Sequence, residues 1–174
     1  TPNAISRFGD DRIVSIRREN AMSPSATRNA GIEKACGSII AFLDDDDEYA
    51  PQFLEKTLRV YKESFSFIGF TWCWVREVED SKDGNATIKE KIWPISQNFV
   101  AENIQKDDLY LKVATSFGLT VRRHCFDVVG VFDEELHGPE DTDFLIRLGQ
   151  NFSYAIVPHL LVSRHHHAGV QLTD

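Results

Sequence analysis

The sequence predicts an α/β fold in which a mainly parallel central sheet is flanked by helices. Short runs of apolar and β-branched residues alternate along the chain with segments of helical pattern, which indicates a layered α/β architecture. Residues 39–43 (IIAFL) are apolar throughout, as is typical of a parallel strand covered on both faces. The 174 residues, 42% of them hydrophobic, are enough for one domain with a sizeable core.

The first elements follow from local signals. Residues 12–16 (RIVSI) alternate charged and β-branched side chains and predict a short strand. A helix is predicted to follow, because Ser23 suits an N-cap and Pro24 suits the first helical position. Gly37 suits a left-handed stop after that helix. The apolar run 39–43 then predicts a buried strand.

A second helix is predicted from Pro51, and aromatic residues mark the strand after it. One face of this helix should carry its apolar side chains, Phe53, Leu54, Leu58 and Tyr61. Residues 65–75 are rich in aromatic and β-branched residues, which favours a strand. Residues 77–87 are polar and contain a turn signal, so we expect a hairpin tip or an excursion from the sheet. Residues 88–112 predict loop with some helix.

The last third of the chain predicts further short elements. In order, these are a strand at 115–121, a helix at 122–129, a helix from Glu140, and short strands at 154–157 and 160–162. Gly130 suits the end of the first of these helices. The helix from Glu140 should bury its apolar residues, Phe144, Leu145 and Leu148.

Charge and cysteine content exclude several classes of protein. The net charge of -8 argues against a nucleic-acid-binding protein, which needs a basic face, but allows a nucleotide bridged by a metal ion. The three cysteines, Cys36, Cys73 and Cys125, match no zinc-site spacing, and their odd number argues against a disulfide framework. No apolar run approaches the ~20 residues of a membrane span. We therefore expect a cytoplasmic protein, whose contact with the inner face of a membrane would be peripheral.

Five consecutive acidic residues, 44–48, follow the strand at 39–43. Carboxylates this close repel one another and raise one another's pKa, and a hard divalent cation with oxygen ligands would relieve the repulsion. The alternative is a solvated acidic loop before the next helix, whose N-terminus favours negative charge. In open α/β sheets, ligands bind beyond the carboxyl ends of strands, where this run lies.

Five motifs follow one another along the chain: residues 26–32 (ATRNAGI), 37–47 (GSIIAFLDDDD), 51–55 (PQFLE), 121–134 (VRRHCFDVVGVFDE) and 140–148 (EDTDFLIRL). In their order and spacing, which extend over most of residues 12–166, they resemble the family 2 glycosyltransferases with the GT-A fold. The resemblance implies a single GT-A domain over residues 1–174, without the family's first strand or strands. We expect upstream residues to supply that strand, which in the family binds the base and ribose.

The resemblance implies roles for the residues on the donor side. Asp44 and Asp46 match the family's Asp-x-Asp pair. Asp46, with Asp44, would bind Mn²⁺ or Mg²⁺ together with the nucleotide diphosphate, and Asp44 or Asp45 would reach the donor nucleotide. Arg28 stands where the family has a basic residue near that nucleotide. A surface salt bridge is the alternative role for Arg28.

On the acceptor side, Glu140 and Asp141 match an acidic pair of the family. An inverting transfer needs a base to take the proton of the acceptor hydroxyl, and Asp141 is the candidate, with Glu140 orienting the acceptor or the base. A helix N-terminus favours the ionised form that a base requires. The alternative is helix capping by Asp141 or Asp143.

Three consecutive histidines near the end of the chain, His165, His166 and His167, allow two interpretations. One of them, with His166 in the best register, reaches the metal or the diphosphate, as the resemblance implies; alternatively they form a solvated tail. Three aromatic residues could stack on a sugar or pack in the core, Trp72, Trp74 and Trp93.

The implied function is transfer of a sugar, with inversion, from a nucleoside-diphosphate sugar to an acceptor hydroxyl in polysaccharide or glycan synthesis. A UDP-sugar is the expected donor, and a glycan or lipid-linked glycan the expected acceptor. Two other classes fit some of the same features. A sugar-nucleotide nucleotidyltransferase has a similar sheet and metal carboxylates, but the Gly-rich phosphate loop that it needs near its start is not found. A catalytically inactive metal- or glycan-binding domain would bind the ligands without transfer.

Overall fold

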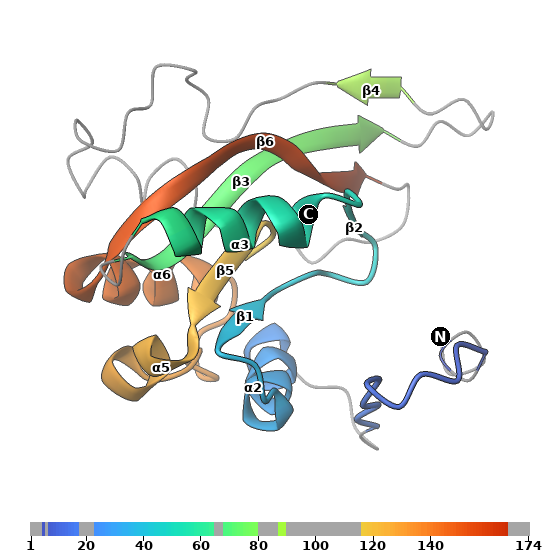
Figure 1. Cartoon of the computed structure of the whole chain (residues 1–174). Helices are drawn as coiled ribbons and strands as arrows, with labels where there is room; N and C mark the ends of the chain where they lie inside the picture. The colour runs from blue at the N-terminus through green and yellow to red at the C-terminus, as the bar shows by residue number, and fades with distance from the viewer. Residues whose placement is uncertain are drawn as a thin grey trace.

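The computed structural model describes residues 5, 7–17, 23–64, 68–79, 87–89 and 116–166, with the backbone alone at residues 79, 87–89 and 166. Within these ranges, helices pack on both faces of one curled sheet, which confirms the predicted α/β fold (Figure 1). The sheet has six strands in the order β1-β5-β3-β6-β2, with β4 on β3. Their bounds are β1 Ile39–Ala41, β2 Glu48–Tyr49, β3 Ile68–Glu79, β4 Thr87–Lys89, β5 Leu119–Arg122 and β6 Ser153–His166.

The prediction of a mainly parallel sheet is wrong for the described strands. Only β3 and β6 pair in parallel, whereas β1–β5, β5–β3, β3–β4 and β6–β2 are antiparallel. The apolar run that suggested parallel pairing forms β1, next to β5, in which Leu119 and Val121 are fully buried. Within the run only Ile40 and Phe42 are buried, whereas Ala41 and Leu43 are exposed, so the run is covered on one face and not on both.

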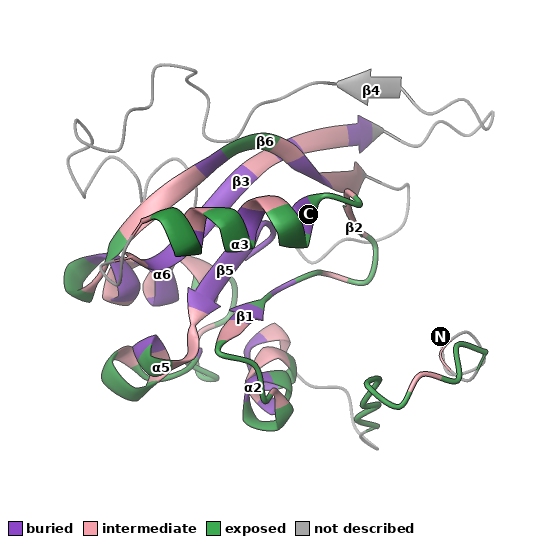
Figure 2. Cartoon of the chain, viewed as in Figure 1, coloured by how far each residue is buried: buried purple, intermediate pink, exposed green. Residues whose placement is uncertain are grey.

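Two core layers lie on opposite faces of the sheet. Alternate residues of β3 point to opposite sides. Phe70 and Trp72 pack against residues of α2, α5 and α6, whereas Cys73 and Val75 pack with Phe53 of α3. Figure 2 shows the resulting buried stripe through β3 and β5. Trp72 is therefore a core residue, Trp74 is half-buried, and Trp93 lies outside the described residues.

Helix α2 runs from Pro24 to Lys34 and begins as predicted. The Ser23 hydroxyl accepts a hydrogen bond from the backbone N–H of Ala26 at 3.2 Å. The predicted left-handed stop at Gly37 is wrong, since Gly37 is not among the glycines with positive φ. The helix ends instead at Ala35, whose backbone is extended, so no left-handed residue is needed.

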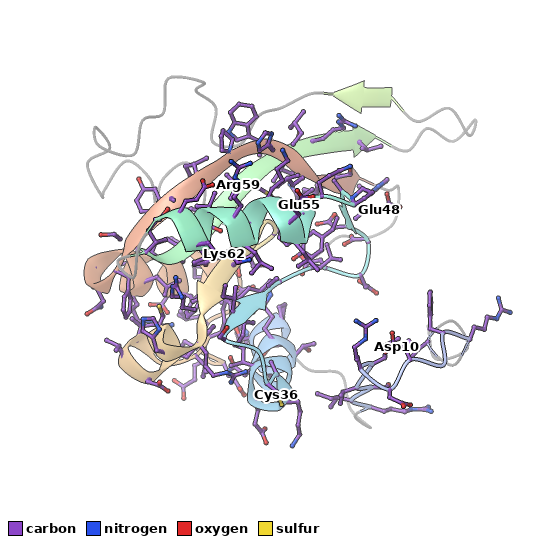
Figure 3. All side chains as sticks on the ribbon, viewed as in Figure 1. Asp10, Cys36, Glu48, Glu55, Arg59 and Lys62 are labelled. Atoms are coloured by element: carbon purple, nitrogen blue, oxygen red, sulfur yellow. The ribbon has the colours of Figure 1, made fainter. Side chains whose placement is uncertain are left out.

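Helix α3, Phe53–Glu63, buries a different face from the predicted one. Phe53, Thr57 and Tyr61 are buried, at the i, i+4, i+8 positions of one helical stripe. Leu54 and Leu58 are 62% and 40% exposed, so the prediction that they share one face with Phe53 and Tyr61 is wrong. The Tyr61 hydroxyl fixes the register of the buried stripe by hydrogen-bonding to Thr120 of β5. The exposed side of α3 faces the viewer in Figure 2, and Figure 3 labels three of the charged residues of α3, Glu55, Arg59 and Lys62.

Helices α5 and α6 match their predictions closely. Helix α5, Arg123–Val129, ends at Gly130, whose φ of 76° explains the glycine. Helix α6, Glu140–Asn151, buries its predicted apolar residues, Phe144, Leu145 and Leu148. The strands predicted at 154–157 and 160–162 are parts of the single strand β6, and the pairing register with β3 shifts next to Pro158, which lacks a backbone donor.

The strand predicted at 12–16 is not formed. Ile13, Val14 and Ile16 are 44%, 67% and 42% exposed, and this stretch lies apart from the sheet in Figures 1 and 3, where Asp10 is labelled. Alternating side chains specify a strand only where a partner strand is available. The two described ends of the polar stretch 77–87 belong to antiparallel strands, since Glu77 and Glu79 of β3 pair with Lys89 and Thr87 of β4, and the residues between them lie outside the described ones. The cysteines are all free, and no helix of the described chain is long and apolar enough to cross a membrane.

Candidate active site

Arg28 brings together three of the predicted motifs. Its guanidinium lies between the end of β1 and the N-terminus of α6. Nη1 is 3.0 Å from Oδ1 of Asp141 and 3.3 Å from Oε1 of Glu140, and Nη2 is 3.4 Å from Oδ1 of Asp44. Only 15% of the Arg28 side chain is exposed. Arg28 therefore makes salt bridges, but they are largely buried and not the surface salt bridge of the alternative, and their partners are predicted functional residues.

The ring of Phe132 supports the Arg28 guanidinium. The guanidinium carbon lies 5.5 Å from the ring centroid. The Asn29 side chain bonds both backbone groups of Phe132. Its Nδ2 donates to the Phe132 carbonyl oxygen at 2.9 Å, and its Oδ1 accepts from the Phe132 N–H at 3.0 Å. Phe132 also packs on Phe144, with ring centroids 4.3 Å apart. Sequence reasoning gave Asn29 no role, and its only signal was its place beside Arg28 in the 26–32 motif.

Asp141 uses both of its oxygens. Oδ1 accepts from Arg28, and Oδ2 accepts from the backbone N–H of Ser116 at 2.9 Å. Burial raises the pKa of Asp141, while Arg28 and the Ser116 N–H oppose that rise. The capping alternative is wrong, because α6 has no side-chain cap and Asp143 instead pairs with Arg147 at 2.6 Å.

Glu140 is buried beside Asp141. Its Oε1 contacts Arg28, and its Oε2 accepts from the backbone N–H of Gly138 at 3.1 Å. Gly138 has a φ of 107°, which only glycine adopts readily, so the loop can turn its N–H toward the carboxylate. A glycine two residues before an acidic pair was the available signal for this contact.

The acidic loop is tied to the last strand. The backbone N–H of His165 donates to Oδ1 of Asp47 at 3.2 Å, and the hydroxyl of Tyr49 donates to the carbonyl of Phe42 at 2.5 Å. Burial, with the like charges of Asp46 and Asp44, raises the pKa of Asp47 to about 6. The sequence does not single out the half-buried carboxylate of Asp47, because nothing in the run distinguishes it from its acidic neighbours.

The predicted metal ligands are only partly brought together. Asp45 and Asp46 are exposed in the loop next to Asp44. His165 Nε2 is 4.0 Å from Oε2 of Glu48, which Figure 3 labels, whereas the His166 side chain and His167 lie outside the described atoms. In the described part of the chain, no three His, Cys, Asp or Glu side chains form a metal-binding group by themselves. Burial is the largest cause of the raised Asp47 pKa, and the repulsion from Asp46 and Asp44 that adds to it would be relieved by a Mn²⁺ or Mg²⁺ ion whose coordination a diphosphate completes.

The whole chain is similar to known glycosyltransferases. The sequence profile of the family described as glycosyltransferase like family 2 matches residues 3–171. A Bacillus subtilis protein described as the uncharacterized glycosyltransferase YwdF is 28% identical over 149 residues, which are 84% of this chain and 52% of that protein. A Campylobacter jejuni GalNAc(5)-diNAcBac-PP-undecaprenol beta-1,3-glucosyltransferase is 26% identical over 141 residues, 76% of this chain and 40% of that protein.

A solved structure supports the fold. The crystal structure of S. aureus TarS, residues 1–349, in complex with UDP-GlcNAc superimposes with a TM-score of 0.74 at 16% identity. The match covers 99% of this chain and 48% of the TarS chain. This chain thus spans about half the length of the curated relatives that it matches.

Proposed function

The chain belongs to the glycosyltransferase-like family 2, and from that premise we propose that it transfers a sugar from a nucleoside-diphosphate sugar to an acceptor hydroxyl, with inversion at the anomeric carbon. One observation carries the proposal. Arg28 joins Asp44, on the predicted donor side, to Glu140 and Asp141, on the predicted acceptor side. Residues far apart in sequence are therefore in contact, which supports the proposal that the donor and acceptor sides adjoin at Arg28.

On the donor side, Arg28, Asp44 and Asp45 would contact the nucleotide diphosphate. Asp46 and Asp44, with His166, would hold Mn²⁺ or Mg²⁺, which when bound stabilises the charge on the leaving diphosphate. A UDP-sugar is the proposed donor, and the TarS complexes with UDP-GlcNAc and with UDP support this choice by analogy of fold.

On the acceptor side, Asp141 would act as the base. As the acceptor oxygen attacks the anomeric carbon, a carboxylate oxygen of Asp141 takes the hydroxyl proton, and the bond from that carbon to the diphosphate oxygen breaks. The diphosphate leaves with the electron pair. Burial raises the pKa of Asp141, which makes its carboxylate a stronger base than an exposed one. Glu140, held by Gly138, would keep Asp141 and the acceptor in place.

A glycan or lipid-linked glycan is the proposed acceptor. The name of the Campylobacter jejuni relative describes a glucosyltransferase that acts on an undecaprenol-linked glycan, and this supports an acceptor of that class. Such a lipid would be met at the inner face of a membrane, so we propose a cytoplasmic protein with peripheral membrane contact.

Thermal unfolding with nucleoside diphosphates tests the proposal. Mn²⁺ with UDP at about 100 times its dissociation constant should stabilise the chain by ~2.7 kcal/mol, which would raise the melting temperature by several degrees. Asp46→Ala should remove this stabilisation, whereas Glu55→Ala, an exposed acid on α3, should keep it. An unchanged melting temperature with every nucleoside diphosphate would contradict the donor assignment. Stabilisation without donor hydrolysis or transfer would instead indicate a binding domain.

A further inference from the structure

Ser116 begins a tight turn that leads into β5. The N–H of Leu119 donates to the carbonyl oxygen of Ser116 at 3.1 Å, which closes a turn of four residues. Gly118, the third of them, has a φ of 73°, and a Cβ at this position would lie 3.0 Å from Sγ of Cys73. Because the backbone conformation and the available space both favour glycine, the sequence specifies this turn.

The two central residues of the turn anchor it to the sheet. Phe117 is only 8% exposed and belongs to the core layer on the α3 side. The guanidinium carbon of Arg164, on β6, lies 5.0 Å from the centroid of the Phe117 ring. The carbonyl oxygen of Gly118 accepts the N–H of Cys73, on β3, at 3.3 Å. These contacts are made with β3, β6 and the core, so the sheet sets the position of the turn.

Ser116 donates two hydrogen bonds to the carboxylate of Asp141. Its N–H donates to Oδ2 at 2.9 Å, and its hydroxyl also bonds to the carboxylate. Ser116 is 2% exposed, so water competes little for either bond. One donor alone would leave the carboxylate free to pivot about a single bond, whereas two donors on one fixed residue restrict that motion.

The charged groups that face Asp141 hold it less firmly than Ser116 does. Arg28 of α2 divides Nη1 between Asp141 and Glu140, at 3.0 and 3.3 Å. Glu140, beside Asp141 on α6, repels its charge. Arg28 is also a long side chain, whereas the N–H of Ser116 belongs to a backbone turn anchored on the sheet. Ser116 is therefore the group best placed to define the orientation of the carboxylate.

We propose that Ser116 is a positioning residue for the base: the turn at 116–119 holds its N–H and hydroxyl so that the Asp141 carboxylate keeps one orientation toward the acceptor hydroxyl. A base takes a proton efficiently only from a defined position. Ser116 acts through Asp141 and not on the donor. The inference rests on the proposed function and adds to it the element that orients the base.

Ser116→Ala isolates the contribution of the hydroxyl, because the backbone N–H remains. With a single bond left, the carboxylate should spend less time in the productive orientation, and kcat should fall about tenfold while the KM for the donor stays within about twofold. The hydroxyl bond favours the charged form of Asp141, so its loss should raise the pKa of Asp141 and move the acid limb of kcat/KM to higher pH. Ser116→Thr, which keeps a hydroxyl, should recover most of the rate.

The measurement is the release of UDP from UDP-glucose and UDP-N-acetylglucosamine at saturating Mn²⁺ across pH, in which water takes the place of the acceptor hydroxyl. Thermal melts verify that each variant is folded. Thr120→Val on β5 is the matched control, because it removes a buried hydroxyl that bonds to Thr71 at 2.7 Å and to Tyr61 at 3.0 Å. It should lower the melting temperature and leave kcat and the acid limb unchanged.

A double variant tests whether Ser116 acts through the base. In the Asp141→Asn background, Ser116→Ala should cause no further loss of kcat, since no base remains to be positioned. A tenfold loss that persists in this background would overturn the positioning role, as would an equal loss in Thr120→Val.

The remaining outcomes separate the role of Ser116 from the proposed function. An unchanged kcat and acid limb in folded Ser116→Ala, beside a large loss in Asp141→Asn, would overturn the positioning role and leave the proposed function standing. If the wild-type chain releases no UDP from either donor, or Asp141→Asn releases it as fast as the wild type, the proposed function fails in its transfer or its base, and the role of Ser116 fails with it.

Discussion

Two groups of carboxylates in this molecule differ in how their charge is balanced. Asp44, Glu140 and Asp141 surround the guanidinium of Arg28, and two of them also accept backbone N–H groups. In the acidic loop, Asp47 accepts one backbone N–H, and burial with the charges of Asp46 and Asp44 raises its pKa to about 6. The first group surrounds its own cation, whereas in the second the charge of Arg164 offsets the rise in the Asp47 pKa only in part, and a cation from outside would relieve the remaining repulsion.

The comparison assigns the two groups different tasks. A carboxylate that is already oriented by fixed donors is suited to proton transfer, which needs a defined position. A loop with excess negative charge is suited to a divalent cation that arrives with the diphosphate. Asp44 belongs to both groups, so it links the two sides of the proposed site. The predictions below test whether changes in one group of carboxylates leave the task of the other group unaffected.

The largest expected effect is on the rate of transfer in Asp141→Asn. The amide keeps the shape of the side chain and an oxygen for the Ser116 N–H, but it cannot take a proton, so the turnover rate should fall by about 10²–10⁴. Melting temperature and steady-state transfer from a UDP-sugar are the measurements. Asp143→Asn should show the opposite pattern, with lower stability from the lost Arg147 pair and near-normal turnover. Equal turnover in Asp141→Asn and the wild type would exclude Asp141 as the base.

A smaller effect is expected on the pH dependence in Arg28→Gln. The positive charge of Arg28 lowers the pKa of Asp141 against the rise caused by burial, so its removal should raise that pKa further. A base works only when ionised, so the acid limb of kcat/KM should move to higher pH, and activity on that limb should fall about tenfold if the pKa rises by about one. In Arg147→Gln, which removes a cation that contacts Asp143, the limb should stay in place. An unmoved limb in Arg28→Gln would mean that Asp141 does not control it.

The sequence predicted the elements best where the signal is local. Ser23 and Pro24 start α2, Gly130 ends α5, and these signals depend on the backbone of a few neighbouring residues. Predictions that depend on a distant partner were weaker. The pattern at 12–16 met no partner strand, and the apolar run at 39–43 predicted neither the strand direction nor the exposure of Ala41 and Leu43.

The candidate site shows the same division. The motifs identified Arg28, Asp44, Glu140 and Asp141, but their mutual contact depends on how α2, β1 and α6 pack, which no local pattern encodes. The supporting contacts were missed for a related reason. The N–H groups of Ser116 and Gly138 belong to the backbone, which every residue shares, so composition gives no sign of where they point.

The smallest expected effect is on stability, in Asp47→Asn. The native fold raises the pKa of Asp47 from 3.8 to about 6, so the folded state binds its proton more tightly than the unfolded state does. The stability that comes from this proton is present below pH 3.8 and is lost as the pH rises through about 6, because the charged form is the one that burial penalises.

Asparagine is neutral at every pH and can still accept from His165, so the variant should be more stable than the wild type by ~1 kcal/mol well above pH 6 and equal to it at low pH. Chemical denaturation in metal-free buffer across this range measures the difference, with Glu55→Gln on α3 as the exposed control. Saturating Mn²⁺ with UDP should narrow the gap, because a bound cation compensates the charge of the loop. A stability difference between variant and wild type that is constant with pH would show that the fold does not raise the pKa of Asp47. The two acidic groups would then differ in position and not in how their charge is balanced.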